Sequence, residues 1–174
     1  MERRASLELR AKGRKLEGYA AVFGTDTRIR DFTEVILPGA FTATLAERRD
    51  ILALVDHDHR AVLARTRSGS LRLAEDTRGL HFDLDVPDTS FGRDVLALAE
   101  RGDIGGASFG FTVADNGERW QADRRELRAV TLHEVSVVSA WPAYDGTVVA
   151  ARRRSAASGK LAAARAWLDS CTWA

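Results

Sequence analysis

Short segments in which apolar and polar residues alternate recur along most of this chain, and they constrain its fold more than any other feature. In segment 80–86 every even position is apolar and every odd position is polar. A β-strand points successive side chains to opposite faces, so this pattern predicts a strand with one buried face. Related patterns bounded by turn residues occur at 6–10, 16–23, 32–36 and 71–73. The sequence therefore predicts eight or nine short strands in an antiparallel barrel or sandwich, with two or three helices outside it.

Helix and turn signals separate these strands. Asp88-Thr89-Ser90 offers N-cap groups for a helix that runs to Arg101, and Gly102 is a suitable C-cap residue. A shorter helix is predicted to open at Pro38-Gly39-Ala40. Asn116-Gly117 is a strong hairpin signal, which predicts that 120–130 returns as a strand beside the one before it. A further strand is predicted over 131–140.

Composition narrows the functional classes. The chain has 174 residues and a net charge of +1, which fits one ordinary globular domain and disfavours a dedicated nucleic-acid binder. No apolar run approaches the length of a membrane span, and the first residues lack the apolar segment of a signal peptide. Cys171 is the single cysteine, so no internal disulfide is possible and a reducing cytoplasm is expected.

The segment 105–111, Gly-Gly-Ala-Ser-Phe-Gly-Phe, surrounds Ser108 with small residues and then with two phenylalanines that can anchor a strand. Glycine permits close approach by another backbone and conformations that point amide hydrogens at a developing oxyanion. Ser108 is therefore a candidate nucleophile, with Gly105, Gly106 and Phe109 as the region from which oxyanion donors would come. Taken alone, the same glycines equally mark an ordinary turn into a strand.

A serine nucleophile needs a general base, and the base needs an acceptor that orients it. His57 is a candidate base because it follows the continuous apolar segment 51–55, which predicts a buried strand. Glu134 and His133 are both candidate partners for that imidazole. They point to opposite faces of a regular strand, so only one can face His57, and both faces carry apolar residues. The pattern leaves the choice open, although an isolated carboxylate at Glu134 would carry a large desolvation cost.

A metal site is the rival interpretation. His57 and His59 have the spacing that puts two imidazoles on one strand face, and His133 or Glu134 would supply a third ligand. The chain contains no second spaced pair of ligands, so we expect no metal and no cofactor.

Four blocks that occur in a fixed order resemble the prohead (procapsid maturation) proteases of tailed bacteriophages and their prophages. These are serine peptidases distantly related in fold to herpesvirus assemblins. The likeness runs from about Leu16 to Tyr144, and no block alone carries it. The blocks are 16–23, 37–41, 54–58 and, as the most specific, 106–111 together with 132–138 and 142–144 downstream.

The resemblance implies a mainly β fold with α (α+β), an assemblin-like, closed or near-closed antiparallel β-barrel with two or three surrounding helices. It maps the family's catalytic residues onto Ser108, His57 and Glu134, with His133 as the alternative third member because assemblins use a second histidine there. It implies a protease domain over 1–150. The Arg/Ala-rich tail over 151–174 departs from the family pattern, and we expect it to be either helical or self-cleaved.

The substrate implied is the scaffolding segment of the major capsid protein, cut inside an assembling procapsid in the bacterial host cytoplasm. Autocatalytic cleavage and self-association are further expectations, and neither nucleic acid nor membrane is expected as a partner. The alternatives are a catalytically inactive capsid scaffold or assembly module and, more remotely, a metal-dependent hydrolase.

Overall fold

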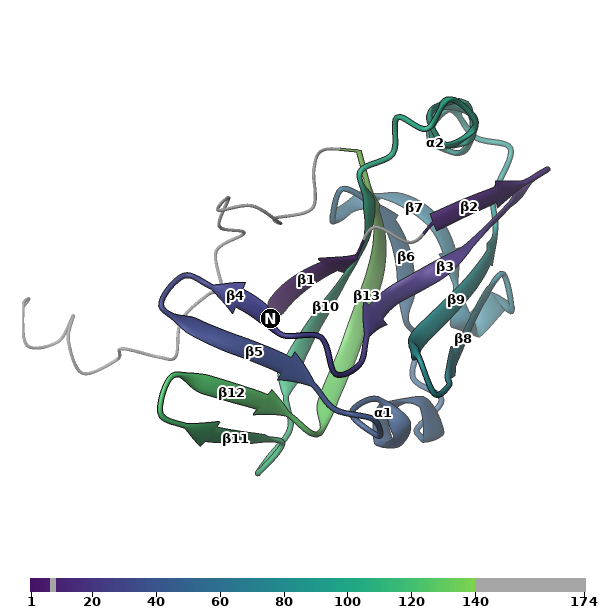
Figure 1. The fold of residues 1–174 in the computed structure, drawn as a ribbon. Helices are drawn as coiled ribbons and strands as arrows, with labels where there is room; N and C mark the ends of the chain where they lie inside the picture. The colour runs from purple at the N-terminus through teal and green to yellow at the C-terminus, as the bar shows by residue number, and fades with distance from the viewer. Residues whose placement is uncertain (7–8, 140–174) are drawn as a thin grey trace, which may run out of the picture.

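The strands fall into three sheets in the computed structural model, which describes residues 1–6 and 9–139 (Figure 1). The first sheet has the order β1-β10-β13-β6-β7, the second β2-β3-β9-β8 and the third β11-β12-β5-β4. Strands of the first sheet are β1 (Glu2–Ser6), β10 (Gly106–Val113), β13 (Val130–Val138), β6 (Leu52–Val55) and β7 (Asp58–Arg65). Those of the second are β2 (Leu9–Lys12), β3 (Lys15–Val22), β9 (Gly79–Asp85) and β8 (Leu71–Glu75). The third contains β11 (Glu118–Gln121), β12 (Arg124–Leu127), β5 (Phe32–Ile36) and β4 (Thr27–Ile29).

The expectation of a closed or near-closed antiparallel barrel is wrong, because all three sheets are open. Within the described residues, β1 and β7 end the first sheet and do not pair with each other or with another sheet. Two pairs, β13 with β6 and β12 with β5, are parallel rather than antiparallel. Alternation along a strand reports which face is buried, but it does not report which distant strand lies alongside. The mainly β content was therefore predictable, whereas the closure was not.

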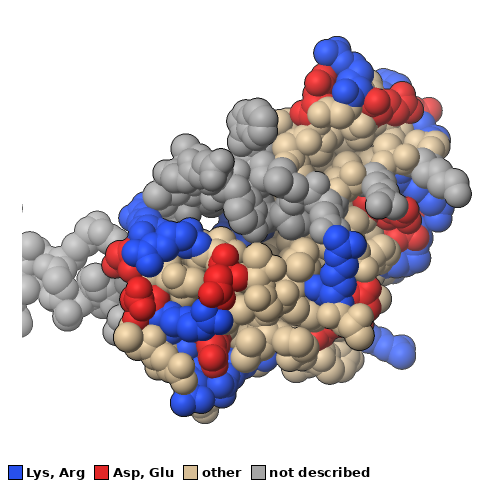
Figure 2. All heavy atoms as spheres, in the orientation of Figure 1, with Lys and Arg blue, Asp and Glu red and all other residues tan. Residues whose placement is uncertain are grey.

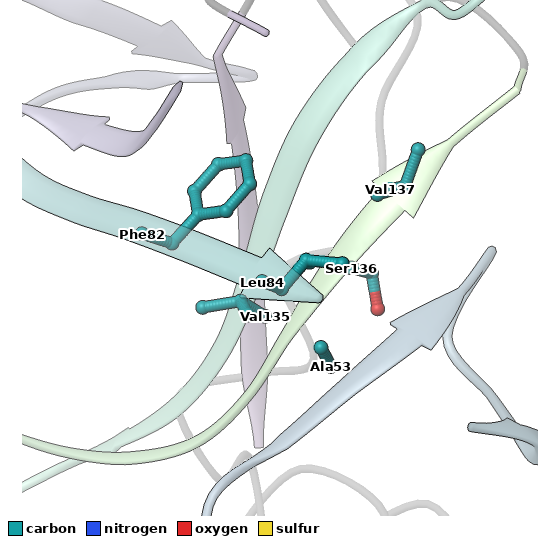
Figure 3. Close-up of a pocket in the computed structure, with 6 residues that line it drawn as sticks. All are labelled: Ala53, Phe82, Leu84, Val135, Ser136 and Val137. Atoms are coloured by element: carbon teal, nitrogen blue, oxygen red, sulfur yellow. The ribbon is translucent and has the colours of Figure 1, made fainter. Parts of the chain in front are cut away.

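The core lies where the first and second sheets pack face to face. Phe82 and Leu84 of β9 lie against Val135 and Val137 of β13, with Ala53 of β6 beside them (Figure 3). Each such apolar side chain contributes roughly 1.5–3 kcal/mol when it is fully buried. The hydroxyl of the intervening Ser136 points away from the ring of Phe82. The polar side chains of β13 therefore lie on the opposite face of the first sheet.

Two α-helices and one 3-10 turn accompany the sheets in the described part of the chain: α1 (Thr42–Ala46), α2 (Ser90–Arg101) and Thr66–Ser68. The predicted long helix is confirmed. The side chain of Thr89 accepts a hydrogen bond from the Gly92 amide at 3.2 Å, and Gly102 ends the helix at φ +75°. Neither α-helix is long and apolar enough to cross a bilayer.

The predicted return strand over 120–130 is wrong. The chain does turn at Asn116-Gly117, but β11 and β12 then pair with each other in the third sheet, and β13 is the partner of β10. The backbone carbonyl of Gly117 accepts hydrogen bonds from the amides of Arg128 and Ala129 and so closes this excursion at its base. The strand predicted from residue 131 is confirmed as β13. The division at residue 150 and the tail over 151–174 lie outside the described residues, so both stay predictions.

A buried ion cluster, which the sequence analysis did not predict, joins the first and third sheets. Glu34 of β5 is 2% exposed and accepts hydrogen bonds from Arg4 of β1, at 2.5 and 2.8 Å, and from Arg125 of β12, at 2.9 Å. Arg125 also donates to Glu2 and Glu118. Charges buried this deeply are tolerated only when they are paired and hydrogen-bonded. The cluster fixes β1 against the rest of the molecule.

The third sheet also carries exposed charges of both signs (Figure 2). Basic and acidic residues pair there as Arg28–Asp123, Arg124–Asp26 and Arg128–Glu126. Exposed pairs of this kind add little stability individually. This face therefore presents a mixed surface rather than a field of one sign.

Candidate active site

Ser108 lies in the middle of β10, between β1 and β13. Its flanking residues Ala107 and Phe109 point into the core, so its own side chain projects from the opposite face of the sheet. Ser136 is its direct partner across β13, and Ser108 is 2% exposed. Of the two glycines before it, Gly106 adopts φ +146°, a conformation that other residues rarely adopt.

A β-bulge interrupts β13 directly before Glu134, which lies on the face that carries Ser108. Leu132 pairs with Phe111 and Glu134 pairs with Gly110, so His133 is an extra residue without a partner in the ladder. Because of this extra residue, Leu132 and Val135 both reach the core although they are three positions apart. Strict alternation fails across His133 and Glu134, which is why counting positions along the sequence did not choose between them.

Gly110 provides the space that the Glu134 side chain occupies. A Cβ atom built on Gly110 would overlap Glu134 Oε1 and lie 3.0 Å from both its carboxylate carbon and Met1 Sδ. The sequence analysis included this glycine in the Ser108 segment but assigned it no role. Its role depends on a cross-strand register that the sequence does not reveal.

His57 occupies a two-residue turn between β6 and β7. Val55 pairs with Asp58, and the two central residues have positive φ, +48° at Asp56 and +61° at His57. This is the signature of a type I′ turn, in which glycine or asparagine is preferred at both positions. The carboxylate of Asp56 accepts hydrogen bonds from the amide of Ser139, at 2.8 Å, and from its hydroxyl. The turn is thereby tied to the end of β13.

The imidazole of His57 reaches Glu134 across the sheet. Nδ1 of His57 lies 2.7 Å from Oε1 of Glu134, and the two side chains are 12% and 1% exposed. When the carboxylate is ionised it only accepts hydrogen bonds, so Nδ1 carries the proton and Nε2 is left as a base. The second carboxylate oxygen, Oε2, accepts a hydrogen bond from Ser136 at 2.5 Å. The guanidinium of Arg3 lies 3.9 Å from Oε1.

The three predicted residues thus lie on one face of the first sheet, although they are not all in direct contact. His57 contacts Glu134, Glu134 contacts Ser136, and Ser136 is the cross-strand neighbour of Ser108. No hydrogen bond joins Ser108 to His57 in the described residues. Hydrogen bonds of this kind are often long before substrate is bound, so their absence does not decide the role of either residue.

His133, the alternative third member, is exposed and directed elsewhere. Its Nε2 lies 3.0 Å from the hydroxyl of Thr112. Partial desolvation, followed by the positive charges of the N-terminal amine and Arg49, holds the pKa of His133 below its usual value. The structure therefore places Glu134, rather than His133, against His57.

The predicted oxyanion region is only partly available in this arrangement. The amide of Gly105 already donates to the carbonyl of Val138 at 2.9 Å, and Phe109 lies within the ladder between Arg4 and Val135. That amides of this region donate hydrogen bonds to the oxyanion therefore stays a prediction. For Gly105 and Phe109 it requires the local backbone to rearrange.

The histidines that the rival interpretation assigned to a metal, His57, His59 and His133, are not arranged around a common point. His59 is exposed, and the intervening Asp58 bonds to Arg60. The side-chain hydrogen bond from Arg60 holds the pKa of Asp58 below its usual value. Over residues 1–6 and 9–139, no group of three His, Cys, Asp or Glu side chains is arranged to hold a metal ion.

Comparison with known proteins gives two findings. The family model for the caudovirus prohead serine protease matches residues 2–161. The prohead protease of Enterobacteria phage HK97 is 32% identical over 139 residues, which cover 79% of this chain. The match spans 59% of the length of that relative. No solved structure matches the chain.

Proposed function

Because this chain belongs to the caudovirus prohead serine protease family, we propose that it is a serine endopeptidase of phage procapsid maturation. The observation that carries the proposal is the 2.7 Å contact between His57 Nδ1 and Glu134 Oε1, residues 77 positions apart in the sequence. A carboxylate that orients an imidazole in this way is the base half of a Ser-His-acid triad. Ser108 lies on the same face and is the proposed nucleophile.

In the proposed reaction, Nε2 of His57 takes the proton of the Ser108 hydroxyl while Oγ attacks the scissile carbonyl carbon. Glu134 stabilises the imidazolium that forms. The C–N bond then breaks, and His57 gives its proton to the leaving amine. Water, deprotonated by His57, hydrolyses the resulting ester and restores Ser108.

The burial of Ser108 adds a requirement. At 2% exposure its hydroxyl is not reachable by a peptide, so cleavage requires this face of the sheet to open. From the family to which the chain belongs, we propose that its substrate is the scaffolding segment of the major capsid protein, and that it also cuts its own chain.

The test is co-expression with the major capsid protein encoded in the same genome, followed by mass measurement of both proteins. We expect the capsid subunit to lose an N- or C-terminal segment with the native chain and to stay intact with Ser108→Ala and His57→Ala. Ser68→Ala, which removes an exposed hydroxyl from the 3-10 turn, is the control and should process normally. Complete processing by Ser108→Ala would refute the assignment. If the capsid subunit stays intact when it is co-expressed with the native chain, the result would instead favour the alternative that this chain is an inactive assembly module.

A further inference from the structure

The Glu134 carboxylate has a second partner that the proposed triad does not use. Oε1 bonds to His57, whereas Oε2 accepts a 2.5 Å hydrogen bond from the hydroxyl of Ser136. Ser136 is 3% exposed, and its hydroxyl points away from the apolar core (Figure 3). The donor is therefore held on the same buried face as the carboxylate.

The length of this bond is informative. Hydrogen bonds from a hydroxyl to an ionised carboxylate are about 2.5–2.7 Å long, shorter than those between neutral groups. A buried carboxylate without donors would be strongly disfavoured in its ionised form. Arg3 does not replace the hydroxyl, because its guanidinium lies near Oε1 and its side chain is 35% exposed. Ser136 is the hydrogen-bond donor to Oε2 in the described residues.

We propose that Ser136 is a positioning residue of the reaction, acting on His57 through Glu134. By fixing Oε2 it sets the rotation of the carboxylate, so that Oε1 points at Nδ1 of His57. It also favours the ionised carboxylate, the state that holds the imidazole with Nε2 free. This inference rests on the proposed triad, since a positioning role has no meaning unless His57 is the base.

The experiment measures how fast a fluorophore-bearing fluorophosphonate labels Ser108 in the full chain. It needs no natural substrate, and the labelled peptide identifies the serine. We expect Ser136→Ala to label about 10- to 100-fold more slowly per folded molecule, the loss expected for one hydrogen bond to a buried charge. Thr131→Ala, which removes a hydroxyl from the same strand, should label at the native rate.

Two further readouts separate positioning from a general structural defect. Removing a donor that favours the deprotonated carboxylate raises the proton affinity of the His57–Glu134 pair, so the acidic limb of the labelling profile should move to higher pH. A loss of folded protein would lower the rate without moving that limb. In a double-mutant cycle, Ser136→Ala should cost little once Glu134→Gln is present, because both changes disrupt the same interaction.

The outcomes distinguish this inference from the function on which it rests. If native protein is not labelled at Ser108, or if His57→Ala is labelled at the native rate, the triad is wrong and the role of Ser136 falls with it. If those controls behave as expected but Ser136→Ala labels normally with an unmoved acidic limb, only the positioning role is refuted. Additive effects of Ser136→Ala and Glu134→Gln would likewise refute it.

Discussion

Replacing Gly110 by alanine tests whether the space opposite Glu134 matters for the chemistry. The added Cβ would overlap Glu134 Oε1, the oxygen that bonds to His57, and would lie 3.0 Å from the carboxylate carbon. Ordinary contacts of this kind begin at about 3.4 Å, so the carboxylate must retreat by a few tenths of an ångström or more. Met1 Sδ, also 3.0 Å from that Cβ, limits the room on the other side.

The expected magnitude follows from the bond that is disturbed. The His57–Glu134 contact is 2.7 Å long, and moving or rotating the carboxylate lengthens or misaligns it. Loss of a hydrogen bond to a charged group costs about 1.5–3 kcal/mol, which corresponds to roughly a 10- to 100-fold slower reaction at Ser108. Overpacking at a buried site adds about 1–3 kcal/mol of lost stability.

Fluorophosphonate labelling at Ser108, measured per folded molecule, reports the first effect, and thermal unfolding reports the second. Gly117→Ala is the matched control, because its Cβ would collide with the carbonyl of Ala129, away from Glu134. That variant should lose stability and keep its labelling rate. If Gly110→Ala labels as fast as the native chain, the Glu134 carboxylate does not need the position seen here, and the reasoning fails.

Three other predictions follow from the same geometry. Glu134→Gln should slow labelling far more than His133→Gln, because only Glu134 contacts His57; the reverse ranking would favour a pair of histidines. Asp56→Ala removes the acceptor that ties the His57 turn to β13, so thermal unfolding should shift down by roughly 4 °C, or about 1 kcal/mol, and an unchanged midpoint would contradict this. Burial alone would raise the pKa of Glu2, but Arg125 and Arg4 hold it below the usual 4.5. Its stabilising contribution is therefore complete above about pH 4.5 and is lost as pH falls through the lower folded value. Urea unfolding between about pH 3 and pH 7 should show a flatter acid dependence for Glu2→Gln than for the native chain.

Local signals were enough to place the individual candidate residues on their elements. The apolar segment before His57 and the small residues around Ser108 predicted a strand end and a strand, which are the places where β6 and β10 carry them. The choice between Glu134 and His133 was out of reach, because it depends on the bulge at His133. A bulge is defined by the register between two paired strands, and the alternation along one strand does not reveal that register.

Long-range pairing limited the prediction of the fold in the same way. The parallel neighbours of β12 and β13 come from segments far away in the sequence, so the barrel was inferred from strand number rather than from pairing. The burial of the Glu34 carboxylate could not be predicted either, because Glu34 lies in an alternating segment where a charged residue usually faces water. Arg4 and Arg125, from two other strands, make its burial tolerable.

Several departures from local rules meet at one contact, although positive φ also occurs elsewhere, at Arg30, Arg48, Asn116 and Ala122. His57 is the second of two consecutive non-glycine residues with positive φ, a bulge directly precedes Glu134, and a glycine without room for a Cβ faces its carboxylate. Unfavourable backbone conformations cost about 1–3 kcal/mol each and persist only where the surrounding structure enforces them. Here the enforcing interactions are identifiable, because Asp56 ties the turn to Ser139 and Ser136 fixes the carboxylate. A fold that needed only stability would be served better by a regular turn and an apolar residue in place of Glu134. The energetic cost of this buried, hydrogen-bonded pair therefore supports a catalytic rather than a structural reason for the His57–Glu134 contact.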